Sequence, residues 1–208
     1  MSWHPSLTDP SAACEQCSAP LISRLHCFKC GALQFPSGEV TPYEAFGFPE
    51  SFQVDLDLLE ERYQQLTVEL HPDFYANASK REQRQSELAS ALLNRAYGTL
   101  RNPVARANDL LPRLAQGVAL DERQLPPGFL MEMFGMQESL DELLESGTPE
   151  EITQTRTELA ERHATLISGL VPHFAEAEAS ATPTTLQTLQ TDLNAERYLH
   201  RLLERFPV

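Results

Sequence analysis

The sequence predicts a mostly α-helical protein with three parts: a small cysteine-rich module, a helical hairpin and a three-helix bundle. Three observations support this prediction. Apolar residues recur every three or four positions in the long segments after residue 41, as they do along one buried face of a helix. No stretch of any length alternates in the way that a half-buried strand does. All four cysteines lie before residue 38, in a segment that has no sustained periodicity.

Composition excludes several classes of protein. The chain has 208 residues, of which 41% are hydrophobic, so it is long and apolar enough to form a core. No apolar run approaches the roughly 18 to 20 residues that a membrane helix requires, and the first residues resemble neither a secretory signal nor a transit peptide. We therefore expect a cytoplasmic bacterial protein, or a mitochondrial matrix protein if the chain is a processed eukaryotic form.

The net charge of −14 argues against general binding to nucleic acid, because that affinity comes from Lys and Arg that neutralise phosphates. The charge is also unevenly distributed along the chain. Residues 80–113 contain 7 basic and 3 acidic side chains, whereas residues 114–208 contain 6 basic and 16 acidic ones. The last third of the chain is therefore expected to present an acidic surface.

Caps and apolar spacing locate the helices of the hairpin. Thr41, Pro42 and Glu44 have the pattern of a capping box, and Gly47 predicts the end of this short helix. Asp55 is expected to cap the next helix, whose apolar stripe comprises Leu56, Leu59, Tyr63, Leu66 and Leu70. A third helix begins near Ser79 or Lys80, and its stripe comprises Leu88, Leu92, Ala96 and Leu100, with Leu93 and Tyr97 beside them. The two stripes can bury each other if the helices are antiparallel.

The remaining helices follow from the same signals. Asn102 and Pro103 start a short helix, and Phe129 to Ser146 form a longer one that ends at Gly147. Thr148 caps a long helix that Gly169 and Pro172 should kink or end, and residues 185–206 form the last helix. The predicted domains are 1–38, 41–113 and 128–208, with a linker at 114–127.

The cysteines form two pairs with metal-ligand spacing, Cys14-x-x-Cys17 and Cys27-x-x-Cys30. Two such knuckles can surround Zn²⁺ with four thiolates, which leaves no open position and so predicts a structural rather than a catalytic ion. A pair of disulfides or a redox pair is the alternative. An intracellular location disfavours stable disulfides, and neither pair opens a helix after a strand as a redox pair does. We expect His26, beside Cys27, to be exposed rather than a ligand.

The triplet His71-Pro72-Asp73 interrupts the apolar pattern between the second and third helices. Pro72 keeps His71 out of helical geometry, so the preceding helix should end there. His71 and Asp73 are then expected at the exposed tip of a helical hairpin. From the residues alone, this triplet is an ordinary turn in which His71 and Asp73 cap helix ends.

Residues 41 to 113 resemble a J-domain, the module that couples to DnaK-type chaperone ATPases. The resemblance comes from the short first helix, the amphipathic second helix, the triplet, and a third helix that leads into "NRAYGTLRNPVARA". With "FLMEMFGMQESLDELLE" further on, the chain is similar to the HscB family of co-chaperones for iron–sulfur cluster assembly. The segment "CEQC…CFKCGALQ" resembles the subgroup that has a tetracysteine zinc motif before its J-domain.

This resemblance implies a regulator of a partner ATPase and no chemistry on the chain itself. His71, Pro72 and Asp73 would contact a DnaK/HscA-type chaperone and stimulate its ATP hydrolysis. The family usually adds basic residues from the helix before the triplet, and here that helix offers only Arg62 among several glutamates. We expect Lys80, Arg81 and Arg84, which follow the triplet, to supply the positive charge, although three cations on a helix are by default a solvated face.

The resemblance also implies a binding surface for an IscU-like iron–sulfur scaffold. The matching positions step along one side of a helix, with one further residue from the last helix: Leu130, Met131, Phe134, Glu138, Glu142 and Tyr198. From periodicity alone, Leu130, Met131 and Phe134 are better explained as bundle core, and the resemblance reverses this preference for Leu130 and Phe134. Met133 and Met136 stay core candidates. Gly135 stands where the family usually has an acid.

Two alternatives belong to other classes of function. A zinc-ribbon adaptor that binds nucleic acid or another protein is disfavoured because the cysteine segment has only Arg24 and Lys29 as bases. A metalloenzyme would need His71 and Asp73 together with a further histidine, namely His163, His173 or His200. These residues are scattered, and none of them has the spacing of a metal-ligand motif. The expected oligomeric state is a monomer or a weak dimer.

Overall fold

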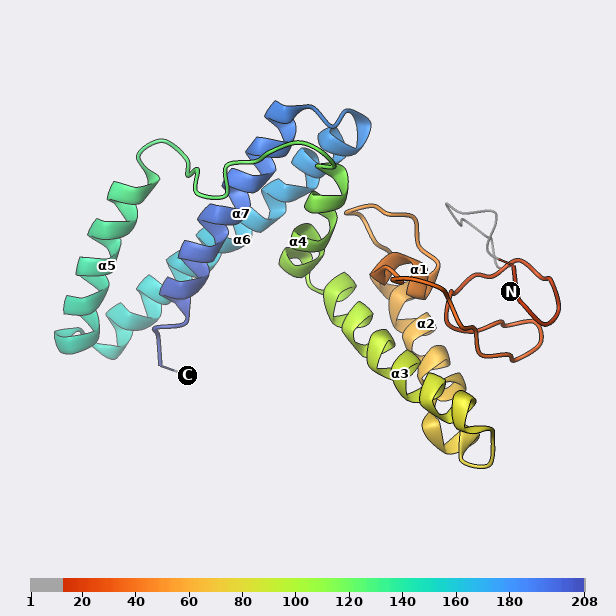
Figure 1. Ribbon diagram of the computed structural model, residues 1–208. Helices are drawn as coiled ribbons and strands as arrows, with labels where there is room; N and C mark the ends of the chain where they lie inside the picture. The colour runs from red at the N-terminus through yellow and green to blue at the C-terminus, as the bar shows by residue number, and fades with distance from the viewer. Residues whose placement is uncertain (1–12, 208) are drawn as a thin grey trace. The chain divides into compact units, whose positions relative to one another are not determined.

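The computed structural model describes residues 13–207 and divides into two compact units that meet in the chain between Arg106 and Ala107 (Figure 1). The described residues form helices and no named strand, which confirms the predicted fold class. The helices are α1 (Pro42–Phe46), α2 (Leu56–Glu69), the 3₁₀ turn η1 (Pro72–Tyr75), α3 (Lys80–Arg101), α4 (Pro103–Leu114), α5 (Phe129–Ser146), α6 (Pro149–Ala179) and α7 (Pro183–Leu203). Within residues 13–207, no helix is long and apolar enough to cross a membrane.

The predicted caps are present. The Thr41 side chain accepts a hydrogen bond from the Glu44 N–H, and the Glu44 side chain accepts one from the Thr41 N–H. Gly47 ends α1 with a φ of 70°. A Cβ atom at Gly47 would lie 2.2 Å from the carbonyl oxygen of Ile22, so only glycine fits both the backbone geometry and the close approach.

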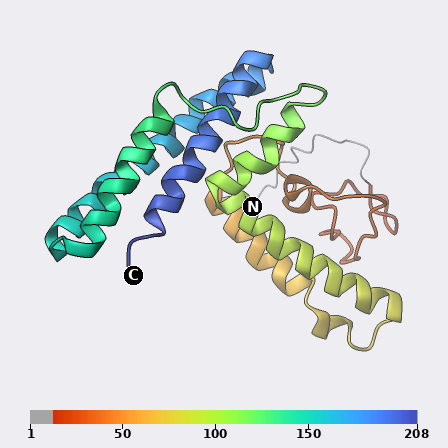
Figure 2. The same ribbon diagram turned by 60° about the vertical axis from the view of Figure 1, so that its left-hand side comes forward.

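In the first unit, α2 and α3 run antiparallel as a hairpin that α1 packs against (Figures 1 and 2). Most of the predicted stripe of α2 is buried, but Leu56 is exposed. The stripe predicted for α3 was partly wrong, since Leu88 is exposed and the buried residues are Ser86, Ala89, Leu93, Ala96 and Leu100. The real spacing of three and four residues follows 3.6 residues per turn, whereas steps of four drift around the helix.

The cysteine module packs on the hairpin within the first unit. The Ser23 hydroxyl donates to the Ala45 carbonyl at 2.7 Å, and Gln85 Nε2 of α3 donates to the Gln34 carbonyl at 2.9 Å. Arg24 forms an ion pair with Glu44 at 3.1 Å. The module is therefore held on α1 and α3 by polar contacts as well as by burial.

In the second unit, α6 and α7 form an antiparallel pair, and α5 contacts both of them (Figure 1). Helix α6 continues through Gly169 and Pro172, so neither residue ends it. Helix α7 begins at Pro183 after a capping box from Thr182, slightly earlier than predicted. The core of this unit comprises Phe129, Met133, Leu140, Leu159, Ala195, Leu199, Leu202 and Phe206.

Candidate functional sites

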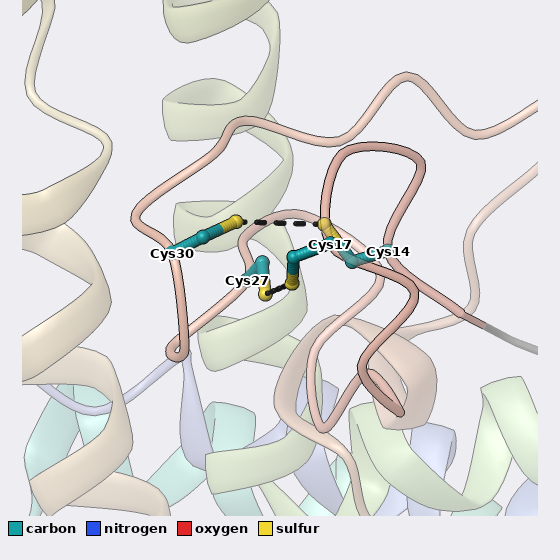
Figure 3. A group of neighbouring side chains, drawn as sticks. All are labelled: Cys14, Cys17, Cys27 and Cys30. Carbon is teal, nitrogen blue, oxygen red and sulfur yellow. Dashed lines mark hydrogen bonds between the residues drawn. The ribbon is translucent and has the colours of Figure 1, made fainter.

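The four cysteines converge at one point of the first unit (Figure 3). Cys14 Sγ lies 3.6 Å from Cys30 Sγ, and Cys17 Sγ lies 3.7 Å from Cys27 Sγ. All four sulfur atoms lie within 4.8 Å of one another, and none is in a disulfide. Zn–S bonds of about 2.3 Å in a tetrahedron place sulfurs about 3.8 Å apart. The group therefore fits a four-coordinate metal ion.

The two knuckles share one backbone pattern. The Cys14 N–H donates to the Ala19 carbonyl at 2.8 Å, and the Cys27 N–H donates to the Ala32 carbonyl at 2.9 Å. Four residues after each of these cysteines, the backbone turns left-handed, at Ser18 with φ 55° and at Gly31 with φ 74°. Each turn folds the chain back so that both sulfurs of a pair face the same point.

The sulfur environment favours a bound cation. Burial raises the pKa of Cys14, but N–H groups of Cys17 and Gln16 and the neighbouring thiols lower it to about 6. The N–H of Ala32 lowers the pKa of Cys30, but burial and the other three cysteines raise it to about 12. Adjacent thiolates repel one another, so a metal cation is what would allow all four to be ionised together.

His26 is buried, which corrects the prediction that it is exposed. Its ring makes an edge contact with Phe28, and its Nε2 lies 3.7 Å from a carboxylate oxygen of Glu69 on α2. Burial lowers the pKa of His26, partly opposed by the charge of Glu69. The prediction failed because the sequence does not reveal that the module packs against α2. His26 is not in the group of candidate metal ligands.

The triplet occupies the exposed tip of the α2–α3 hairpin. The side chains of His71 and Asp73 are 50% and 92% exposed. The backbone N–H of Asp73 donates to His71 Nδ1 at 3.2 Å, so a neutral His71 ring would hold its proton on Nε2. Pro72 begins η1, and Phe74, which lies within η1, is also exposed. The histidine thus caps the tip and presents the other edge of its ring.

Side chains of α3 fix the tip, and the sequence alone did not predict this role for them. The hydroxyls of Ser86 and Ser90 donate to the Leu70 carbonyl at 2.6 and 2.9 Å, where α2 ends. Gln83 Nε2 donates to the Ala76 carbonyl at 2.8 Å. The available signal was a pair of serines four residues apart beside the apolar stripe, a pattern that suits bonding to a neighbouring helix end.

Lys80, Arg81 and Arg84 are exposed and border one groove of about 570 Å³ at the start of α3. Phe35 of the cysteine module forms part of the same groove, and the Arg81 guanidinium lies 4.2 Å from the centre of its ring. A cation over an aromatic face at this distance is a favourable contact. We call these four residues the basic groove.

Arg62 does not present its charge to a partner, which corrects its predicted role. It is buried, and its Nη1 donates to the carbonyls of Phe46 and Gly47 at 2.6 and 3.0 Å. Its guanidinium also lies 4.8 Å from the centre of the Phe48 ring. Arg62 therefore ties α2 to the end of α1, and burial lowers its pKa. The sequence pattern could not distinguish this buried cation from a solvated one.

The six positions predicted to bind a scaffold all lie in the second unit and are exposed: Leu130, Met131, Phe134, Glu138, Glu142 and Tyr198. Met131 and Phe134 are 77% and 55% exposed, whereas Met133 on the other side of α5 is buried in the core. Leu130, Met131 and Phe134 are therefore surface residues and not bundle core. The centre of the Tyr198 ring lies 6.1 Å from the centre of the ring of Phe129, the first residue of α5. We call these six residues the α5 face.

Comparisons with known proteins identify a matching family and several similar proteins. Residues 125–205 match the family described as the HSCB C-terminal oligomerisation domain. The chain is 32% identical to the co-chaperone protein HscB homolog of Shewanella woodyi, over 65% of this chain and 81% of that protein. It is 36% identical to the homolog of Aliivibrio salmonicida, but that match covers 52% of this chain and 64% of the relative's length.

Two solved structures are similar over most of their length. The human co-chaperone protein HscB has a TM-score of 0.73 and 26% identity, covering 94% of this chain and 96% of that one. The chaperone HscB from Vibrio cholerae has a TM-score of 0.61 and 27% identity, covering 81% of this chain and all of that one. These relatives show that the chain, with its tetracysteine group, belongs to the HscB family, whose members described above are named co-chaperone or chaperone proteins.

Proposed function

We propose that this protein is a J-type co-chaperone of iron–sulfur cluster assembly. It binds an IscU-like scaffold, delivers it to a DnaK/HscA-type chaperone, and stimulates the ATPase of that chaperone to promote cluster assembly or transfer. The observation that carries the proposal is the exposed His71-Pro72-Asp73 tip of the hairpin, in a chain of the HscB family. The protein itself is then a regulator, not an enzyme.

The hairpin tip suits docking to another protein because it is both exposed and rigid. Hydrogen bonds from Ser86, Ser90 and Gln83 fix the backbone on either side of η1, so little conformational entropy is lost when a partner binds. The exposed Phe74 adds an apolar contact next to the triplet. His71, Pro72 and Asp73 are the residues proposed to contact the ATPase.

The basic groove is the proposed source of positive charge for this docking. Helix α2 carries Glu60, Glu61 and Glu69, and its Arg62 is buried, so α2 cannot attract an acidic partner. Lys80, Arg81 and Arg84 follow the tip directly and are exposed. Complementary charge of this kind mainly accelerates association and selects partners. We therefore expect docking to weaken as ionic strength rises.

The α5 face suits a partner that has an apolar spot beside basic residues. Its apolar side chains are exposed at one end of α5, and Glu138 and Glu142 continue the same side of the helix. Exposed apolar side chains cost free energy in water unless a partner covers them. A surface of aromatic, Met and Leu residues with a charged rim is typical of protein–protein contacts. An IscU-like scaffold is the proposed occupant.

The tetracysteine group is proposed to bind structural Zn²⁺. Four thiolates match the preference of zinc for sulfur in a closed tetrahedral site. Bound zinc would organise the cysteine module, since a segment this short has little core of its own. Cys14, Cys17, Cys27 and Cys30 would hold the ion, and no step of the proposed mechanism passes through it. The bacterial relatives favour a location in the bacterial cytoplasm.

The test is the steady-state ATPase rate of a DnaK/HscA-type chaperone with the scaffold present. The wild-type protein should raise this rate, and His71→Gln should abolish the increase. Asn77→Ala, an exposed position in the same loop outside the triplet, is the matched control and should behave as wild type. If His71→Gln stimulates as well as Asn77→Ala, the role assigned to the tip is wrong.

A further inference from the structure

Three potential metal ligands converge on the seam between α6 and α7, in the second unit. They are His163 of α6 and Glu196 and His200 of α7, and one ligand atom from each lies within 4.8 Å of the other two. His163 Nε2 lies 2.9 Å from Glu196 Oε1. The imidazole rings of His163 and His200 are 5.9 Å apart between centres, with 28° between their planes. This group shares no residue with the tetracysteine group or the α5 face.

The fold brings together three residues whose proximity cannot be seen from their positions in the sequence. Glu196 and His200 are four residues apart, so they project from the same side of α7 one turn apart, a spacing that helical metal sites use. His163 comes from the neighbouring antiparallel helix, 33 residues earlier in the chain. No ligand spacing among the histidines is visible in the sequence because one ligand is a glutamate and one comes from another helix.

The environment of Glu196 favours a bound cation. Glu196 is only 4% exposed, and a buried carboxylate is costly unless its charge is compensated. The His163 ring supplies a hydrogen bond, but no Lys or Arg pairs with Glu196 among the described ion pairs. The side chain of His200 is 57% exposed, so an ion can reach it from solvent. A buried carboxylate beside a solvent-exposed imidazole is an arrangement that suits a bound metal ion.

The geometry needs little adjustment to hold an ion. Tetrahedral coordination with bonds of about 2.1 Å places ligand atoms about 3.4 Å apart. The ligand atoms of the three residues lie at most 4.8 Å apart. His200 is exposed and lies in the last turn of α7, so rotation of its side chain can bring its ligand atom to the shorter distance. Glu204, one turn further, has an oxygen 3.6 Å from His200 Nε2 and can orient that ring.

We propose that His163, Glu196 and His200 form a second metal site, which binds a divalent transition-metal cation such as Zn²⁺, Co²⁺ or Ni²⁺ and links α6 to α7. Two imidazoles and one carboxylate suit these borderline ions and not Mg²⁺ or Ca²⁺, which prefer oxygen ligands. Three protein ligands leave a coordination position for water or for a ligand from a partner. The proposal is independent of the proposed co-chaperone function.

The test is a Co²⁺ titration of the full-length protein after its tetracysteine group has been loaded with zinc and excess metal removed. Isothermal calorimetry should show one further equivalent of Co²⁺, with a matching visible absorption band. His200→Ala, at an exposed position that the core does not need, should weaken this binding by at least about tenfold, since even loss of a residue that only supports a ligand costs 10- to 100-fold. His163→Ala should do the same.

The matched control is His173→Ala, which removes a histidine of the same helix pair that bonds instead to Asp192 at 2.6 Å. It should leave Co²⁺ affinity unchanged. Co²⁺ should also raise the melting temperature of the wild-type protein, and Mg²⁺ should not. The proposal is overturned if the wild-type protein binds no second equivalent, if His200→Ala binds as tightly as wild type, or if His173→Ala weakens binding equally.

Discussion

The hairpin tip and the α5 face are both exposed and are both proposed to bind partners, but they are built differently. The tip is a short irregular segment whose geometry depends on hydrogen bonds from α3, and the cysteine module contacts the adjoining part of α3. The α5 face consists of five side chains on one regular helix and Tyr198 of α7, and the opposite side of α5 is anchored in the core through Phe129, Met133 and Leu140. Buried supports should therefore matter for function at the tip, whereas only the exposed side chains themselves should matter at the α5 face.

The largest effect is expected from loss of the metal ligands. Cys14→Ser with Cys27→Ser should abolish tight zinc binding and unfold the cysteine module, since removal of a structural metal removes a large part of a small module's folding free energy. Metal analysis should show about one zinc per wild-type chain after dialysis against a weak chelator, and none for the variant.

The same double variant also tests whether the two surfaces are independent of each other. Phe35 belongs to the module and borders the basic groove, so ATPase stimulation should fall. Scaffold binding, measured by calorimetry, should stay at the wild-type level because the α5 face lies in the other unit. Loss of scaffold binding would contradict the assignment of the two surfaces to separate units.

A second effect is expected from a buried support of the tip. Ser86→Ala removes one of two donors to the Leu70 carbonyl and should lower the free energy of unfolding by about 0.5 to 1.5 kcal/mol, since Ser90 still bonds to that carbonyl. Urea unfolding measures this loss, and ATPase stimulation should also decrease. Ser168→Ala, an exposed serine that bonds within its own helix, is the control and should change neither quantity. A loss of stability without any loss of stimulation would show that the tip does not need its rigid geometry.

A third effect is expected at the α5 face. Phe134→Ala should weaken scaffold binding about tenfold or more, as truncation of a central aromatic residue costs at least about 1 to 2 kcal/mol of binding free energy. The melting temperature should be unchanged because Phe134 is a surface residue. Val171→Ala removes another exposed apolar side chain of the second unit and should leave binding intact. Equal losses in the two variants would remove the α5 face as the binding surface.

The smallest effect concerns the attachment of α5 to α6. A hydrogen bond from Arg162 holds the pKa of Glu132 below its usual 4.5, despite some opposing burial. The ionised carboxylate therefore stabilises the fold above the unfolded pKa, and this contribution disappears as the pH falls through the lower folded pKa. At pH 7, Glu132→Gln should be less stable by under about 1 kcal/mol, because the pair is partly exposed.

Urea unfolding at several pH values checks this prediction. The difference between wild type and Glu132→Gln should shrink as the pH falls below 4.5 and vanish in stronger acid. A difference that grows on acidification would have the wrong sign. Scaffold binding at pH 7 should be unaffected, since Glu132 lies outside the α5 face.

Much of the fold could be predicted because its signals are local. Thr41, Asp55 and Thr148 are caps that a few neighbouring residues identify, and the structure confirms each of them. The cysteine spacing likewise predicts the converging sulfurs without knowledge of the rest of the chain. Elements whose ends are set by contacts within a few residues are the ones a sequence reveals.

The errors came from contacts between distant segments. Arg62 and His26 were expected at the surface, and both are buried against segments that lie far away in the sequence. The exposure of Leu88 has the same origin, since the side of α3 that faces α2 depends on how the helices pack. The group of His163, Glu196 and His200 was missed because helix pairing, not sequence spacing, brings it together.

Chaperone ATPase activity, measured with and without the scaffold, shows whether the two surfaces act separately in one co-chaperone. Wild type should stimulate moderately alone and more strongly with the scaffold. His71→Gln should lose both increases, whereas Phe134→Ala should keep the first and lose the second. Stimulation by His71→Gln at the wild-type level, or loss of both increases in Phe134→Ala, would contradict the account.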